Sequence, residues 1–499
     1  MVALAVQSGP ANAAAEREAG ATAVSLTGTA RASAIAEAQS DAPSTAKAIG
    51  LGDQEGLVAR DVVKDADGTV HTRYERTYAG LPVLGGDLVV HAAKNGARST
   101  TKASEARISV DTKVASLAAP KGARKVVWAA GGAPVLAWEG VTEGVGADGT
   151  PSKLHTITDA RSGKVLYSYD DIETGIGASE YSGSVTLGTK ANGSQFELND
   201  TSRGGHKTYD LAGGTNGTGS LFTDADDTWG DGTPANRQTA AADAHYGAAV
   251  TWDFYKNELG RLGIRGDGVA AYSRVHYGNA YVNAFWDDSC FCMTYGDGAN
   301  NTKPLTSLDV AGHEMSHGLT ASTAGLRYTR ESGGLNEATS DIFGTAVEFY
   351  AANASDPGDY LIGEKIDIRG NGTPLRYMDK PSRDGASADY WDKNVGRLDV
   401  HNSSGVANHF FYLLSEGSGA KTINGVSYDS PTANGSTVAG IGRTKAYKIW
   451  YKALSVYMTS STDYAGARTA TLKAAADLYG TGGAEYQAVA AAWTGVNVK

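Results

Sequence analysis

The seven residues Gly312-His313-Glu314-Met315-Ser316-His317-Gly318 contain the motif HEMSH, in which two histidines stand four residues apart and a glutamate directly follows the first. On a helix, residues i and i+4 lie on the same face, one turn apart. His313 and His317 can therefore hold one metal ion between their rings, and neutral imidazole is a good zinc ligand. Glu314 lies one residue off that face, so its carboxylate can reach a water on the metal. The competing interpretation is two surface histidines on a helix.

The segment Gly334-Leu335-Asn336-Glu337-Ala338-Thr339-Ser340-Asp341 offers the rest of a zinc site. Catalytic zinc takes three protein ligands and water, and Glu337, twenty residues after His317, is the candidate for the third ligand. Asp341 lies one helical turn further on and can accept the second N–H of a ligating histidine. Alone, Glu337 would be a solvated acid in the first turn of a helix. Together with HEMSH and Asp341 it predicts catalytic zinc.

Composition limits the class of protein. A chain of 499 residues suggests about three domains, and 41% hydrophobic and 20% charged residues are typical of a folded soluble protein. Lys+Arg 44 against Asp+Glu 55 gives a net charge of -11, which argues against nucleic acid as a partner. No run of about 18 apolar residues occurs, so we expect no membrane span.

The amino-terminal residues MVALAVQSGPANAAA end in small residues typical of a signal-peptidase site, around Ala11 to Ala15. We interpret them as the tail of a secretion signal whose beginning is missing, against the alternative of a flexible Ala/Ser-rich end. The two cysteines, Cys290 and Cys292, would have Cα atoms about 6.6 Å apart in a strand, near the limit for a disulfide. A local disulfide is favoured over a C-x-C metal pair, because two thiolates do not complete a zinc site.

Hydrophobic periodicity divides the chain into β-rich and helical parts. Alternating patterns predict strands at 69–78, 87–92, 126–128, 135–138, 154–158 and 164–169, and around 274–286. Helical spacing is found at 240–255, 335–352, 405–416, 440–458, 462–479 and 483–494. HEMSH thus lies where a β-rich half meets a helical half, and clefts between domains are common places for sites.

These residues and spacings resemble the thermolysin family of secreted neutral metallopeptidases, over about 178–499. The resemblance includes Asn283-Ala284-Phe285-Trp286, Asp309 through His317, Gly333 to Tyr350, and Val400-His401-Asn402-Ser403-Ser404-Gly405. It implies an α+β fold: a β-rich catalytic subdomain at 175–318, a helical subdomain at 319–499, and zinc in the cleft between them. It also implies two small α+β pro-region modules at 46–110 and 111–174, after a leader and linker at 1–45. The modules would assist folding and inhibit the protease until a cut between about Glu173 and Tyr181.

The resemblance implies the roles of the site residues. Zinc held by His313, His317 and Glu337 polarises the scissile carbonyl and acidifies its bound water, and Glu314 takes a proton from that water and passes it to the leaving amine. Tyr328 and His401 would stabilise the oxyanion. The family supports the equivalent of His401 with an aspartate five positions earlier, but Gly396 stands there, and Asp399 is the possible substitute.

Substrate binding is implied as well. Arg376 would hold a substrate carbonyl on the primed side, and Asn283 with the backbone of Ala284 would bind the extended peptide. An apolar pocket for the residue after the scissile bond would prefer Leu or Phe, and it would be lined by Val310, Ile362, Ile366 and Leu375.

Calcium is the second implied metal. Asp309, Glu348, Asp359 and Glu364 match family ligands, completed by the Leu361 carbonyl, and converging carboxylates suit a hard cation. Pro357 offers no side-chain oxygen for an adjacent second ion, so we expect one calcium there. Asp224 and Asp226 resemble a possible further calcium loop, whereas Thr373 replaces an acid at another family site.

The sequence therefore predicts a secreted, extracellular zinc endopeptidase, made as a self-processed precursor. Its partners would be peptide and protein substrates and its own pro-region, with neither nucleic acid nor membrane, and we expect a monomer. One alternative is a zinc-binding protein without turnover, such as an adhesin, but such a protein has no use for a base at Glu314. A related aminopeptidase would need a motif for the free amino terminus, and we find none.

Overall fold

The computed structural model describes residues 23–24, 28–65, 67–113, 119–130, 132–145, 151–170 and 173–499. The chain forms two compact units, Met1–Asp171 and Ile172–Lys499. The predicted remnant of a secretion signal around Ala11 to Ala15 lies outside the described residues. In the described part, no helix is long and apolar enough to span a membrane.

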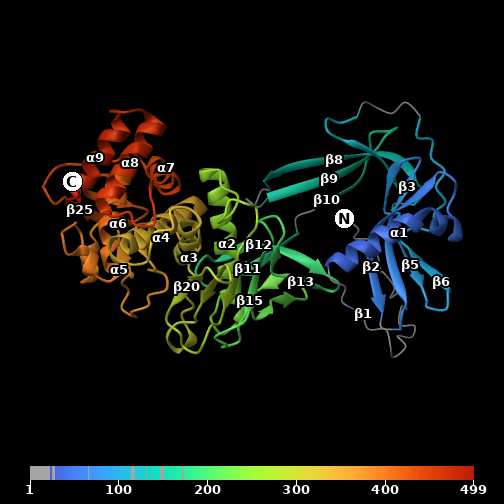
Figure 1. The fold of residues 1–499 in the computed structure, drawn as a ribbon, viewed down its shortest axis with the longest axis horizontal. Coiled ribbons are helices and arrows are strands. Elements are labelled where there is room, and N and C mark those ends of the chain that lie inside the picture. The colour runs from blue at the N-terminus through green and yellow to red at the C-terminus, as the bar shows by residue number, and fades with distance from the viewer. Residues whose placement is uncertain are drawn as a thin grey trace, which may run out of the picture. The chain divides into compact units, whose positions relative to one another are not determined.

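The first unit is built on one mixed sheet with a helix on it (Figure 1). Its elements are β1 (Ala23–Val24), α1 (Gly28–Ala48), β2 (Glu55–Asp65), β3 (Val70–Tyr78), β4 (Leu81–Leu84), β5 (Leu88–Ala92), β6 (Arg98–Lys102), β7 (Arg124–Trp128), β8 (Val135–Val145), β9 (Pro151–Asp159) and β10 (Val165–Asp170). The strand order is β1-β2-β3-β4-β7-β8-β9-β10, with β5 pairing with β3 and β6. The parallel pairing of β4 with β7 joins the two predicted pro-region modules into one sheet.

Helix α1 corrects the interpretation of 1–45 as leader and linker. Residues 28–45 belong to this helix, which packs Ala42 and Ala46 against Leu57, Tyr74 and Leu88 of the sheet. Gln39 of α1 also exchanges hydrogen bonds with the backbone of β2, at 2.8 Å and 3.3 Å. The buried face of α1 consists mostly of alanines, so its apolar period was too weak to recognise.

The second unit begins with strands (green in Figure 1) and continues as helices (yellow to red). Its strands are β11 (Glu173–Ala178), β12 (Ser184–Asn192), β13 (Gln195–Glu197), β14 (Asn199–Asp200), β15 (His206–Asp210), β16 (Ser220–Leu221), β17 (Thr223–Asp224), β18 (Thr228–Trp229), β19 (Tyr272–Val275), β20 (Ala284–Asp287), β21 (Cys292–Tyr295), β22 (Leu361–Ile362), β23 (Arg376–Tyr377), β24 (Gly419–Ile423) and β25 (Val426–Ser430). Its helices are α2 (Arg237–Leu259), α3 (Leu308–Ala321), α4 (Arg330–Ala351), α5 (Val400–Ser403), α6 (Gly405–Glu416), α7 (Arg443–Lys452), α8 (Tyr464–Tyr479) and α9 (Ala484–Gly495). A π-helical turn, Ala453–Tyr457, follows α7.

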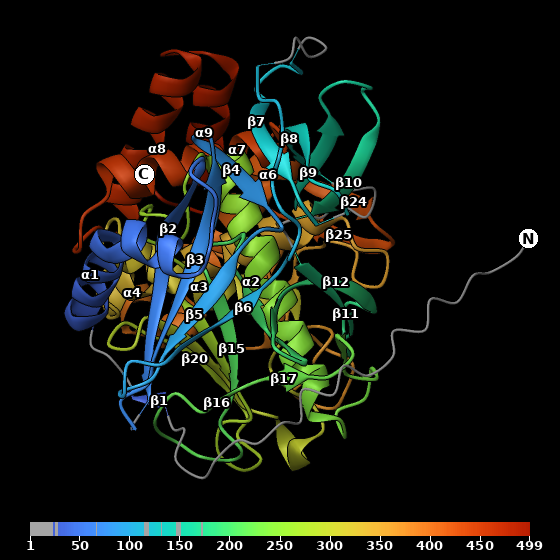
Figure 2. The ribbon, with the colours of Figure 1, turned by 90° about the vertical axis from the view of Figure 1, so that its right-hand side faces the viewer.

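Two sheets make up the β-rich half, with strand orders β17-β13-β12-β11-β18 and β14-β15-β19-β21-β20. Helix α2 packs against strands of both sheets, and Figure 2 shows it from a second side. It begins with Asn236 as its N-cap, whose side chain accepts the Gln238 N–H, and it ends at Gly260 in the left-handed conformation. This half is followed by α3 and α4, so the predicted α+β architecture is confirmed.

Candidate active site

Helices α3 and α4 pack closely because glycines face each other at their contact. A Cβ on Gly344 would lie 2.5 Å from the carbonyl oxygen of Asp309, and one on Gly312 would lie 3.1 Å from the Cα of Gly344. The small residues let α4 approach the HEMSH face of α3. The predicted ligands from the two helices thereby converge: His313, His317 and Glu337 form one cluster of ligand atoms.

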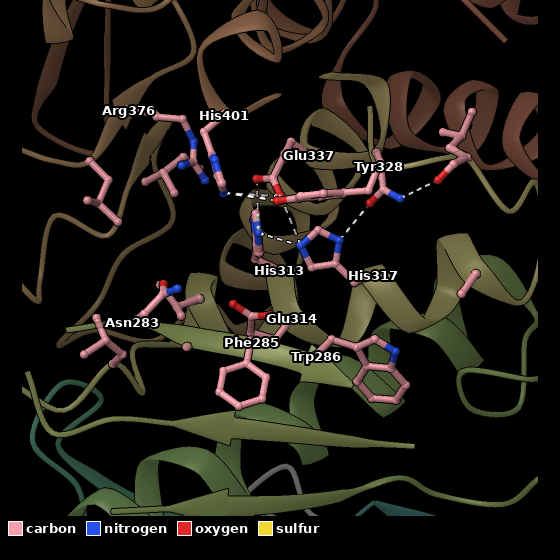
Figure 3. Close-up of a pocket in the computed structure, with 18 of the residues that line it drawn as sticks. Asn283, Phe285, Trp286, His313, Glu314, His317, Tyr328, Glu337, Arg376 and His401 are labelled. Carbon is pink, nitrogen blue, oxygen red and sulfur yellow. Dashed lines mark hydrogen bonds and ion pairs between the residues drawn. The ribbon is translucent and has the colours of Figure 1, made fainter. Parts of the chain in front are cut away.

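The hydrogen bonds of the two rings determine their tautomers. His313 Nδ1 lies 2.9 Å from Asp341 Oδ1, and His317 Nδ1 lies 2.8 Å from Asn336 Oδ1. Both partners are acceptors, and Asn336 is oriented by its own donation to the Leu326 carbonyl at 2.8 Å. Each Nδ1 therefore carries a proton, and when the ring is neutral its Nε2 offers a lone pair to a metal ion. The two Nε2 atoms face each other at 3.1 Å, so either a proton shared between the rings or a metal ion bound by both would satisfy them (Figure 3).

Glu337 supplies negative charge at the same point. Its oxygens lie 3.6 Å from His313 Nε2 and 3.4 Å from His317 Nε2, and its buried Oε2 has no hydrogen-bond partner among the described residues. Burial opposes charge on His313, but Glu337 and Asp341 outweigh burial and raise the pKa of His313 to about 9. Two imidazole nitrogens and one carboxylate, with a side open to the cleft, fit the ligand set of catalytic zinc.

Glu314 lies beside the three ligands and makes no direct ion pair with them among the described contacts. Figure 3 shows its carboxylate in the cleft between the ligands and strand β20. Burial raises the pKa of Glu314, although His313 and His317 oppose that shift. A buried carboxylate is a stronger base than an exposed one, as proton abstraction requires.

Tyr328 and His401 approach Glu337 from outside the two helices. The Tyr328 hydroxyl donates to Glu337 Oε1 and lies 3.2 Å from His401 Nε2. His401 Nδ1 lies 2.7 Å from Asp399 Oδ1, so Asp399 does substitute for the missing aspartate at Gly396. Asp399 is also the N-cap of α5, where it accepts the His401 backbone N–H.

Arg376 is held by Asp341 and lies beside His401 in Figure 3. Its Nε and Nη2 donate to the two oxygens of Asp341 at 2.8 Å and 2.6 Å. Burial favours the neutral acid, but Arg376 and His313 hold the pKa of Asp341 well below its usual range. Asp341 therefore fixes both a zinc ligand and the predicted substrate-binding arginine.

A cleft of about 720 Å³ runs past these groups. Its walls include the predicted residues Asn283, Ala284, Val310, Ile362, Leu375 and Arg376. Ile366 is fully buried in the core, whereas Ile368 lies on the wall of the cleft, so a role for Ile366 in the apolar pocket stays a prediction. The segment between β22 and β23 has no regular structure, so its side-chain directions do not follow from periodicity.

A second cluster brings buried carboxylates together behind the cleft. Glu348, Asp356 and Glu364 offer ligand atoms within 4.8 Å of one another, and in the described part of the chain one buried oxygen of each has no hydrogen-bond partner. Asp356 was missed in the sequence. Burial and the neighbouring acids raise the pKa values of Asp356 and Asp359 to about 7 and that of Glu364 to about 10, and they also raise the pKa of Glu348.

The other predicted calcium ligands take different positions. Asp309 accepts the Gly363 N–H at 2.6 Å and adds negative charge to the cluster. Leu361 follows Asp359, which accepts the Leu361 N–H at 2.6 Å. Asp224 and Asp226 accept nearby backbone N–H groups and join no cluster of three ligand atoms in the described part of the chain.

Cys290 and Cys292 are disulfide-bonded, as favoured from the sequence. Their Cα atoms lie 5.3 Å apart, less than the strand spacing, because Cys290 precedes β21 and Phe291 has a φ of 54°. Sequence reasoning also missed Asn336, which orients His317, and Asn408, which donates to Asp341 at 2.8 Å. The position of Asn336 directly before Glu337 was the only available signal.

Comparisons with known proteins agree with this geometry. Residues 174–321 match the family described as thermolysin metallopeptidase, catalytic domain, and residues 324–498 match its alpha-helical domain. Residues 55–98 match the fungalysin/thermolysin propeptide motif. The chain is 57% identical over 533 residues to a transglutaminase-activating metalloprotease of Streptomyces mobaraensis, covering 100% of this chain and 70% of the relative. It is 37% identical over 484 residues to a thermolysin of Alicyclobacillus acidocaldarius subsp. acidocaldarius, covering 87% and 85%, and 40% identical over 369 residues to a bacillolysin of Bacillus caldolyticus, covering 70% and 64%.

Proposed function

Because this chain belongs to the thermolysin family of metallopeptidases, and is thus a metalloendopeptidase with a propeptide motif, we propose that it is a secreted zinc endopeptidase made as a self-processed precursor. The observation that carries the proposal is the convergence of His313 Nε2, His317 Nε2 and an oxygen of Glu337 that has no hydrogen-bond partner among the described residues. These three groups leave one side open to the cleft, where Glu314 stands.

The chain's own residues divide the chemistry among them. A zinc ion bound by His313, His317 and Glu337 supplies Lewis acidity, which polarises the scissile carbonyl and acidifies water. Glu314 accepts the proton of the attacking water and returns it to the leaving amine. Tyr328 and His401 donate hydrogen bonds to the oxyanion of the tetrahedral intermediate. Arg376, held by Asp341, orients the substrate on the primed side.

We further propose cleavage before bulky apolar residues. Val310, Ile362, Ile368 and Leu375 line the cleft near Arg376 and would bury an apolar side chain. The test uses two peptides that differ only in the residue after the scissile bond, Leu or Ala. We expect kcat/KM to be at least about tenfold higher with Leu, and equal values would contradict the assignment.

We propose that the processing cut lies at the amino-terminal end of β11, within the predicted range from Glu173 to Tyr181. This position is supported by the pairing of β11 with β12 along its length and with β18 in parallel. Tyr181 is buried, and its hydroxyl donates to the Pro304 carbonyl at 2.7 Å. Cleavage beyond β11 would remove a paired strand from the catalytic unit. Sequencing the amino terminus of the active form tests this, and a start later than Ala178 would contradict it.

Calcium is the second proposed metal. Buried carboxylates that raise one another's pKa repel as anions, and a hard cation among them removes that repulsion. Glu348, Asp356, Asp359 and Glu364 would hold the ion. The additional acid Asp356 strengthens the cluster, and calorimetric titration with Ca²⁺ measures how many ions bind.

The alternative of a zinc-binding protein without turnover makes a different prediction. Removing the metal with 1,10-phenanthroline should abolish casein digestion, and added Zn²⁺ should restore it. A protein that binds zinc but digests neither casein nor short peptides would support the alternative.

A further inference from the structure

The tip of the β20–β21 hairpin is closed by the only disulfide bond of the chain. We call residues 288–292 the disulfide tip. Strand β20 lies at the edge of its sheet, and its last pair joins Asp287 to Cys292. Cys290 and Cys292 are bonded around the single residue Phe291, with Cα atoms 5.3 Å apart. So small a ring fixes the backbone of the residue that it encloses.

Phe291 adopts a conformation that bulky residues rarely take. Its φ of 54° lies in the left-handed region, inside the ring that the disulfide closes. Its ring meets that of Trp286 edge-on, with ring centroids 5.2 Å apart. The Arg265 guanidinium lies 3.6 Å from the centre of the Phe291 ring. Phe291 is therefore held between Arg265 and Trp286.

Trp286 lines the cleft and contacts the disulfide tip. Its ring packs against α3 at Gly318, where a Cβ would lie 2.6 Å from Trp286 Cζ2. Its Nε1–H donates to Asp288 Oδ1 of the tip at 2.6 Å. Between Gly318 on one side and Phe291 and Asp288 on the other, the indole has little room to rotate.

Figure 3 shows Trp286 and Arg376 at opposite ends of the cleft, with the proposed zinc ligands and Glu314 between them. If Arg376 binds the primed side of a substrate, Trp286 faces the unprimed side. A peptide that extends several residues before the scissile bond would then reach the indole. A peptide that stops at the scissile residue would not reach it.

We propose that the disulfide tip is a positioning element that fixes Trp286 as the wall of the unprimed end of the cleft. Cys290, Cys292 and Phe291 thereby set the affinity for the amino-terminal part of an extended peptide, with an apolar side chain packing on the indole. The proposal rests on the proposed endopeptidase function. It assigns these three residues no part in the bond-breaking step, so they affect KM more than kcat.

The experiment compares two blocked peptides with the same residues at and after the scissile bond. One stops at the residue before that bond, and the other continues for three more residues, including a Phe. The variants are Phe291→Ala, which removes the aromatic ring, and the double variant Cys290→Ser with Cys292→Ser, which removes the disulfide bond. Thiol reductants are avoided because thiols bind zinc. Tyr486→Ala, a half-buried aromatic on α9, controls for loss of packing elsewhere.

For the long peptide, we expect each change to raise KM about 5- to 10-fold with kcat little altered, because each removes the equivalent of one aromatic contact. For the short peptide, KM should stay unchanged. The protein that carries both changes should have a KM little higher than that of either variant alone, since both changes act through Trp286. Phe291→Tyr, which keeps the aromatic ring, should have the KM of the unaltered protein. Equal effects on both peptides, or an unchanged KM for the long one, would overturn the proposal. If the unaltered protein hydrolyses neither peptide, the proposed function itself fails.

Discussion

The substitution Asp341→Asn leaves the three proposed zinc ligands in place and removes the carboxylate that orients one of them, His313. The two oxygens of buried Asp341 accept four hydrogen bonds: one from His313, two from Arg376 and one from Asn408. Asparagine keeps one acceptor oxygen and turns an NH₂ group toward the donors that the other oxygen served. Arg376 then retains its charge inside the protein without a carboxylate partner.

The expected loss follows from these contacts. Removing one partner of a buried ion pair costs about 3–5 kcal/mol. For a unit that runs from Ile172 to Lys499, an unfolding entropy of about 0.7 kcal/mol per kelvin converts this to a Tm lower by about 4–7 °C. Loss of the carboxylate behind a ligating histidine lowers zinc affinity about 10- to 100-fold.

Two measurements check these values. Calorimetry on the zinc-free proteins gives Tm without self-digestion, and competition with a zinc-binding dye gives the affinity. Asp392→Asn is the matched control, because Asp392 is exposed and only caps the Asn394 N–H at 2.6 Å. If Asp341→Asn equals this control in both Tm and zinc affinity, the account of how the site is supported is wrong.

Three further outcomes are expected. Removing calcium with EGTA should shorten the half-life at elevated temperature, and Glu348→Gln should abolish that calcium effect; an unchanged half-life argues against the cluster as a calcium site. Burial raises the pKa of Asp243 to about 8, above its value of about 4 in the unfolded chain, so folding binds a proton and stability falls as pH rises between these values. Asp243→Asn should flatten that part of a Tm–pH curve, and an unaltered slope would contradict it. Tyr328→Phe should lower kcat about 100-fold while zinc affinity stays the same, and a kcat near that of the unaltered enzyme would remove Tyr328 from the oxyanion site.

The zinc site could be predicted because its chemistry dictates its spacing. His313 and His317 lie one helical turn apart, as two ligands of one ion on the same helix must. Glu337, on the next helix, can reach the same ion as the third ligand. The close approach of the two helices depends on Gly344, whose neighbour across the contact no local pattern reveals. Likewise, the bond from Asn408 to Asp341 joins residues far apart in the chain.

The errors have equally local causes. Helix α1 was overlooked because an alanine face carries little apolar signal, although Tyr74 and Leu88 complete the core beneath it. Ile368, which lines the cleft, was not predicted because it lies in a segment without periodic structure, where tertiary packing decides which side chains face the cleft. Strand geometry misjudged the Cys290–Cys292 spacing because Phe291 leaves the strand conformation.

We propose above all that Glu314 acts as a base beside a zinc ion held by His313, His317 and Glu337. It is tested most directly by measuring zinc content and peptide hydrolysis together, for the unaltered protein and for Glu314→Gln. The precursor of the variant is first cleaved by a trace of active enzyme, which is then removed. The account predicts one zinc per chain in both proteins and a kcat/KM lower by about 10²- to 10⁴-fold or more in the variant. Hydrolysis by Glu314→Gln within tenfold of the unaltered rate, or absence of zinc from the unaltered protein, would contradict it.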